Sequence, residues 1–221
     1  MHFNNMALSK KALPDHALKH IGFKSFTPPP CLAPWIQCFW VAHHPQLPTT
    51  GFIENLYPDG GSNINFYFHD NQLPIVEFSA VQTFSTMNFS GAIDVMGIRF
   101  HPGGAHRLLG LEMPELTGTT QKLGSLQLQT HKDIHLLIDR LADLKNPALR
   151  LKLVEQWLLK QARFLALEIG PVQNILSTSG LLSNQTSIGL LTQKIGFSQR
   201  QLERYFKKEV GITVALSLIH I

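Results

Sequence analysis

Hydrophobic and polar positions alternate in short runs up to residue 125, and the spacing changes after it. Runs of about four to eight residues with apolar side chains at alternate positions, bounded by Gly, Pro, Asn or Asp, are typical of β-strands. The pattern predicts five strands, over residues 35–43, 51–57, 62–69, 74–80 and 92–100.

Two segments of this first half combine proline with glycine. Residues 57–61 (YPDGG) and 101–106 (HPGGAH) therefore predict sharp turns, since proline presets φ and glycine accepts a positive φ. We expect the second turn to open a short helix through Leu108, Leu109 and Leu111.

From residue 126 onwards the apolar positions recur every three or four residues, the period of a helix with one buried face. One helix is predicted from Ile134 to Leu144. A second begins at Pro147, because proline fits the first helical turn, and Gly170 ends it. Its expected core-facing side chains are Leu149, Leu153, Val154, Trp157, Leu158 and Leu165. Residues 171–180 predict a third, shorter helix.

The segment 196–213, GFSQRQLERYFKKEVGIT, carries the most specific pattern. Ser198 followed three residues later by Gln201 is a capping box, which predicts the start of a helix. Leu202, Tyr205 and Phe206 fall on one face of that helix. The opposite face carries four charged side chains: Arg200, Glu203, Arg204 and Lys207.

Residues 187–197 (SIGLLTQKIGF) predict another short helix, which comes just before the helix that starts at Ser198. Ser187 is its expected cap, and Gly196 allows a tight turn between the two helices. This is the pattern of a helix-turn-helix, whose second helix enters the major groove of DNA. Arginine on that helix can donate to guanine, and glutamate can accept from cytosine. The same spacing also fits an amphipathic helical hairpin with a solvated basic face.

The run IGFSQRQLERYFKKEVGIT resembles the first helix-turn-helix of AraC/XylS-type transcriptional regulators. The shared features are a Gly-aromatic-Ser turn, the order Leu-x-Arg-x-Phe-Lys-Lys-Glu, and a closing Gly-Ile-Thr. The resemblance implies base contacts by Gln199, Arg200, Glu203 and Arg204. It implies phosphate contacts by Ser187, Lys207 and Lys208.

Upstream segments are similar to an N-terminal domain of unknown function that often precedes this DNA-binding module. They are PCLAPWIQCFW (30–40), YPDGGSNINFYF (57–68) and GIRFHPGGAHRLLG (97–110). The role that this resemblance implies for the first half is binding of a small-molecule effector of unspecified identity.

The family's DNA-binding domain continues through a linking helix and a second helix-turn-helix. Here the chain ends at Ile221, and VALSLIHI (214–221) does not resemble the next helix of the family. We therefore expect a truncated regulator, whose DNA binding is weak and sensitive to salt because part of the phosphate contacts is lost.

Composition fits a soluble, mildly basic protein. The 221 residues carry a formal net charge of +4, which permits a polyanionic partner. No apolar run reaches the ~18 residues of a membrane-spanning helix, and the N-terminus lacks the apolar block of a signal peptide. We expect a cytoplasmic protein without a membrane partner. Cys31 and Cys38 are expected to be buried thiols.

The eleven histidines contain no His-x-His, so no metal site is expected. A nucleophile elbow and a phosphate-binding glycine loop are also missing, so neither an enzyme nor a cofactor is predicted. Arg99 is expected to pair with a carboxylate such as Asp94 or Glu54. The rival hypothesis is a cupin-like, small-molecule-binding β-rich domain whose helical tail serves association, as in a homodimer.

Taken together, the patterns predict an α+β protein in three parts. Residues 1–125 form a β-rich domain for sensing or association, and residues 126–168 form a helical connector packed on it. Residues 171–221 form a partial helix-turn-helix DNA-binding domain, with double-stranded DNA as its partner.

Overall fold

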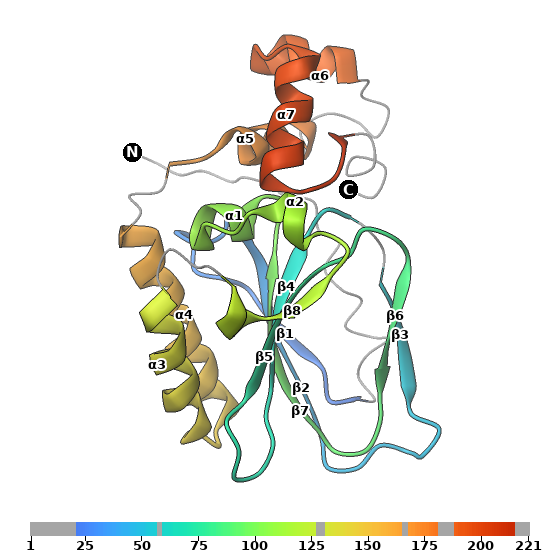
Figure 1. The fold of residues 1–221 in the computed structure, drawn as a ribbon, viewed down its shortest axis with the longest axis vertical. Helices are drawn as coiled ribbons and strands as arrows, with labels where there is room; N and C mark the ends of the chain where they lie inside the picture. Colours follow the sequence, from blue (N-terminus) through green and yellow to red (C-terminus); the bar gives the residue numbers. More distant parts are fainter. Residues whose placement is uncertain (1–20, 57–58, 127–130, 165–167, 181–187, 215–221) are drawn as a thin grey trace.

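The computed structural model describes residues 21–56, 59–126, 131–164, 168–180 and 188–214. A β-sheet stands at the centre of Figure 1, a pair of helices lies along one side, and a small helical unit sits on one end. The α+β class expected from the sequence is confirmed.

The larger sheet is antiparallel and six-stranded. In order across the sheet its strands are β1 (Lys24–Phe26), β2 (Ile36–His44), β7 (Ile93–Phe100), β4 (Ser62–Tyr67), β5 (Ile75–Ala80) and β8 (Thr120–Lys122). A separate ribbon pairs β3 (Phe52–Leu56) with β6 (Ser85–Phe89). The five strands expected from the sequence correspond to β2, β3, β4, β5 and β7.

Alternation along the strands gives the large sheet two different faces. On β4, Ile64 and Phe66 are fully buried on the face that packs against the helices α3 (His131–Ala142) and α4 (Pro147–Phe164). The other face carries a smaller apolar cluster that includes Trp40 and Val95. Gly97 lies directly under Trp40, and any Cβ there would overlap the indole ring. The glycine therefore lets this ring lie flat on the sheet.

An ion pair made by a buried arginine fixes α4 to the sheet. The Nη1 atom of Arg150 lies 2.9 and 2.8 Å from the two carboxylate oxygens of Asp94 on β7, and its guanidinium lies 3.5 Å from the centre of the Phe68 ring. The expected pairing of Arg99 with a carboxylate is confirmed, but its partner is not Asp94, because the two residues lie five positions apart on β7 and so on opposite faces of the sheet. Arg99 instead pairs with Asp59, and the side chain of Glu54 lies outside the described part.

Two burial predictions are also wrong. Leu149 is 51% exposed, because the buried face of α4 runs through Arg150, Val154 and Trp157, and Leu149 lies about 100° from Arg150 around the helix. Cys31 is exposed in the turn before β2, while Cys38 is partly buried, and the two form no disulfide. Leu165 lies outside the described residues.

Three helices form the unit at the end of the sheet: α5 (Pro171–Gly180), α6 (Ile188–Ile195) and α7 (Gln199–Glu209). This C-terminal unit (residues 171–214) has its own apolar core, which includes Val172, Ile175, Leu202 and Phe206. It rests on two short helices, α1 (Gly104–Leu109) and α2 (Met113–Leu116), that close this end of the sheet (Figure 1).

No helix in the described part of the chain has both the length and the apolar composition needed to cross a bilayer.

Candidate nucleic-acid interface

Local signals determine both ends of α7. The Oγ of Ser198 accepts from the backbone N–H of Gln201 at 3.3 Å, and the Oε1 of Gln201 accepts from the backbone N–H of Ser198 at 2.8 Å. This confirms the capping box. At the other end Gly211 has φ of 84°, and its N–H donates to the carbonyl of Phe206 at 3.1 Å. Gly211 thus provides the left-handed cap of α7.

One face of α7 is held by the core of the C-terminal unit. Leu202 and Phe206 are both 0% exposed in the cluster formed with α5. Tyr205 is half-buried, and its ring lies 5.4 Å from that of Phe197, centre to centre. Gly196 has φ of 72° and makes the turn between α6 and α7 as expected. The helix is therefore anchored by side chains on one side only.

The opposite face of α7 carries the charged side chains expected from the sequence. Arg200, Arg204 and Lys207 are exposed, and Glu203 is partly exposed. The four line an open cleft of about 900 Å³, which we call the α7 cleft. Three cations and a single carboxylate favour an anionic partner. Gln199 and Lys208 are exposed but do not line this cleft, and Ser187 lies outside the described residues.

Other residues that line the α7 cleft were not expected from the sequence. They are residues 211–213, which follow α7, and Gln82, which comes from the connection between β5 and β6. Gln82 is about 120 residues away from α7 along the chain, and no local pattern marks it. Only the docking of the C-terminal unit brings the two together.

Polar contacts join the C-terminal unit to the β half, defined here as residues 21–126. Arg107 of α1 pairs with Glu209 of α7 at 3.1 Å, and the Glu209 side chain is only 4% exposed. Thr117 donates its hydroxyl to the carbonyl of Val210 at 3.2 Å. Gln173 of α5 donates to the carbonyl of Pro102 at 3.1 Å. These contacts set the position of α7 relative to the sheet.

The HPGGAH segment supplies part of this junction. Gly103 has φ of 78°, and a Cβ there would lie 3.2 Å from Val172. His101 is largely buried at the end of β7, and burial lowers its pKa to about 4, with Arg99 contributing. His106 shares a 2.7 Å hydrogen bond with the carbonyl of Leu111. Both histidines therefore lie in surroundings typical of residues with a structural role. In the described part of the chain, no three His, Cys, Asp or Glu side chains gather in a group suited to a metal ion.

A polar patch lies on the sheet face away from α3 and α4. Asn65 is 3% exposed, and its Nδ2 donates to the hydroxyl of Tyr67 at 3.4 Å, while its Oδ1 is buried without a hydrogen-bond partner. Burial raises the pKa of Tyr67, and Glu77 adds to this shift. A buried unpaired acceptor beside a hydroxyl is a starting point for binding a polar ligand.

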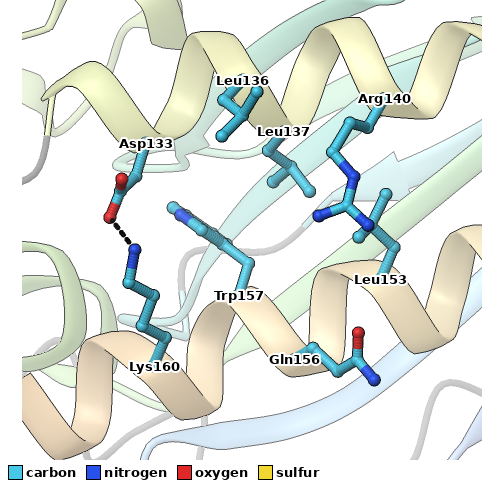
Figure 2. Close-up of a pocket in the computed structure, with 8 residues that line it drawn as sticks. All are labelled: Asp133, Leu136, Leu137, Arg140, Leu153, Gln156, Trp157 and Lys160. Atoms are coloured by element: carbon cyan, nitrogen blue, oxygen red, sulfur yellow. Dashed lines mark hydrogen bonds and ion pairs between the residues drawn. The ribbon is translucent and has the colours of Figure 1, made fainter.

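A second, smaller cleft of about 180 Å³ lies between α3 and α4 (Figure 2). Lys160 and Asp133 form an ion pair of 3.0 Å at one end, and the guanidinium of Arg140 lies between the helices at the other. Leu137, Leu153 and Trp157 form an apolar floor. The cleft is too small for a typical ligand, since such sites are usually about 300–1,000 Å³.

Residues 24–122 match a domain of unknown function, DUF6597. The match runs from β1 to β8 and so covers the whole six-stranded sheet. It confirms the expected likeness of the first half to a domain of unknown function. No curated protein and no solved structure matches the chain.

Proposed function

We propose that this protein is a sequence-specific DNA-binding transcriptional regulator of the AraC type. The observation that carries the proposal is α7, a capped helix with Leu202 and Phe206 fully buried and with Arg200, Arg204 and Lys207 exposed on the other side. A helix anchored in this way keeps its charged face in a fixed direction, as reading of base edges requires.

In this proposal α7 lies in the major groove. Arg200 and Arg204 donate to guanine, and Glu203 accepts from the amino group of cytosine. Gln199, at the first position of the helix, lies close to the same base edges. Lys207 and Lys208, in the last turn, contact phosphates and fix the register without reading sequence. In this proposal the protein binds DNA in the cytoplasm and uses neither a catalytic group nor a cofactor.

The β half would sense an effector in this scheme. Asn65 and Tyr67 favour it, because a ligand with a hydrogen-bond donor would satisfy the buried Oδ1 of Asn65. The same observation supports the second candidate, a small-molecule-binding β domain whose helices serve self-association instead of DNA binding. Under that alternative, removing residues 186–221 leaves ligand binding unchanged and DNA binding plays no part.

Selection of duplexes from a random library by the full chain tests the proposal. We expect an enriched motif with wild type. Arg204→Ala should weaken binding to that motif by about 5- to 150-fold, the equivalent of about 1–3 kcal/mol, and relax preference at one or two base pairs. Lys207→Ala should weaken all duplexes alike. Arg163→Ala, which removes an exposed arginine from α4, is the charge-matched control and should change neither. Identical behaviour of the Arg204 and Arg163 variants would refute base reading by α7.

A further inference from the structure

The α7 cleft has walls from two parts of the chain. Arg200, Arg204 and Lys207 come from α7, and Gln82 comes from the β half. Gln82 is exposed, and of the residues that line the cleft only Glu203 is acidic. The β half therefore presents an uncharged amide, and no acidic side chain, to the space in front of the charged helix.

The side chain of Gln82 packs against Gly118. Its Oε1 packs against Gly118, where a Cβ would lie only 2.8 Å away, and Gly118 has φ of 81°. The backbone N–H of Gly118 donates to the carbonyl of Ala80 at 2.7 Å, at the end of β5. With its oxygen against Gly118, the amide of Gln82 has its N–H₂ group as the donor for a partner.

The same segment also holds α7. Thr117, next to Gly118, donates to the carbonyl of Val210 at the end of α7, and lies so close to Gly211 that a Cβ there would overlap it. Two contacts thus connect the segment of Gln82 to α7. Ala80 bonds to Gly118, and Thr117 bonds to Val210. This short chain of contacts links Gln82 to α7.

The size of the cleft limits what part of DNA it can hold. A helix with its side chains is about 10–12 Å across, and the major groove is about 12 Å wide, so the backbones of both strands run close beside the helix. A space of about 900 Å³ is comparable to the pocket of a drug-sized molecule. It accommodates a short stretch of one DNA strand.

We propose that one DNA strand enters the α7 cleft with its bases towards α7 and its backbone towards Gln82, and that Gln82 donates its side-chain amide to a phosphate of that strand. Glutamine is among the side chains that bind phosphate oxygens in protein–DNA complexes. The β half would then be part of the DNA interface and would supply a contact from outside the helix-turn-helix. This inference rests on the proposed DNA-binding function.

The test uses charge substitutions at Gln82 in the full chain. Gln72 gives a matched control: it is also exposed, and it lies in the β4–β5 turn, at the opposite end of β5 from Gln82. The six residues of β5 place the two glutamines about 20 Å or more apart. The variants are Gln82→Lys, Gln82→Glu, Gln72→Lys and Gln72→Glu. The probe is a fluorescein-labelled duplex about three helical turns long, titrated from 50 to 200 mM salt, with thermal unfolding as the check on folding.

We expect Gln82→Lys to add one phosphate contact. The slope of log affinity against log salt should steepen by about 0.9, which makes the loss of affinity across this salt range roughly 3.5-fold larger than in wild type. Gln82→Glu should weaken binding at every salt concentration, because its carboxylate would face a phosphate. Both Gln72 variants should change affinity only slightly, since their charges lie more than a Debye length from the cleft.

The outcomes separate this inference from the proposed function. If wild type and the Gln72 variants bind the duplex but the Gln82 variants match them, Gln82 has no phosphate contact and only this inference fails. If Gln82→Glu binds more tightly than wild type, the loop obstructs DNA, which also overturns it. If wild type shows no binding at 50 mM salt, the proposed function fails and this inference fails with it.

Discussion

Replacing Phe206 with alanine tests whether α7 depends on the small apolar core of the C-terminal unit. Phe206 is 0% exposed, and it packs in a cluster that is separate from the core of the β half. Truncating a buried phenylalanine to alanine costs about 3–5 kcal/mol through lost burial and the cavity left behind. A unit of about 40 residues has a stability of roughly 2–6 kcal/mol at ordinary values per residue. The substitution therefore removes most of the stability of the C-terminal unit.

The distribution of tryptophan allows this effect to be localised. The three tryptophans are Trp35, Trp40 and Trp157, and all lie outside residues 171–221. Tryptophan fluorescence thus reports unfolding of the β half and the connector, while far-UV circular dichroism also reports the helices of the C-terminal unit. For Phe206→Ala we expect lost helical signal at 25 °C and a nearly unchanged fluorescence transition in urea. DNA binding should disappear with the helical signal.

Phe84→Ala is the matched control, since Phe84 is 56% exposed and its truncation should cost little. A fluorescence transition that shifts as far as the helical signal in Phe206→Ala would show that the C-terminal unit and the β half unfold together. A Phe206→Ala protein as stable as Phe84→Ala would refute the anchoring role of Phe206.

Two further predictions concern the β half. The pKa of His101 is lowered to about 4 in the folded protein, so on acidification the unfolded chain takes up a proton at this histidine before the folded protein does. The free energy of unfolding should therefore be constant above pH 6.5 and fall by up to about 3 kcal/mol towards pH 4. Urea unfolding at pH 7, 5.5 and 4 measures this fall, and His101→Gln should flatten it; an unchanged profile in that variant would assign the fall to other groups. Arg150→Ala should lower the free energy of unfolding by about 1–3 kcal/mol, since it removes both hydrogen bonds to the partly exposed Asp94. Urea unfolding followed by fluorescence measures this loss. The control is Lys160→Ala, whose ion pair is exposed and which should lose less than about 1 kcal/mol of unfolding free energy. Equal losses in the two variants would contradict a structural role for the Arg150–Asp94 pair.

The helix α7 could be predicted almost residue by residue, because the sequence signals that mark its ends are local. Ser198 and Gln201 lie three positions apart, and Gly211 ends the same helix, so no distant residue is needed to identify its ends. The longer strands were predictable for a similar reason, since a run such as SNINFYF alternates over several residues. Strands β1 and β8 are three residues long and carry no detectable alternation.

Features that depend on tertiary contacts escaped prediction. The partners suggested for Arg99 illustrate this: Asp94 is five residues away on the same strand and so on the opposite face of the sheet, where α4 brings Arg150 to it from 56 residues away. Gln82 looks like any polar loop residue in the sequence, and only the docking of α7 through Arg107 and Thr117 gives it a place in the cleft. The same holds for Asn65, whose unpaired Oδ1 follows from the packing around the sheet.

The most direct test of the account is equilibrium binding of duplex DNA by the wild-type full chain at 50 and 200 mM salt. With two to four phosphates neutralised by α7, affinity should fall by roughly 10- to 150-fold between the two conditions. Absence of binding at 50 mM salt, or an affinity that does not change with salt, would contradict the claim that the exposed face of α7 binds DNA.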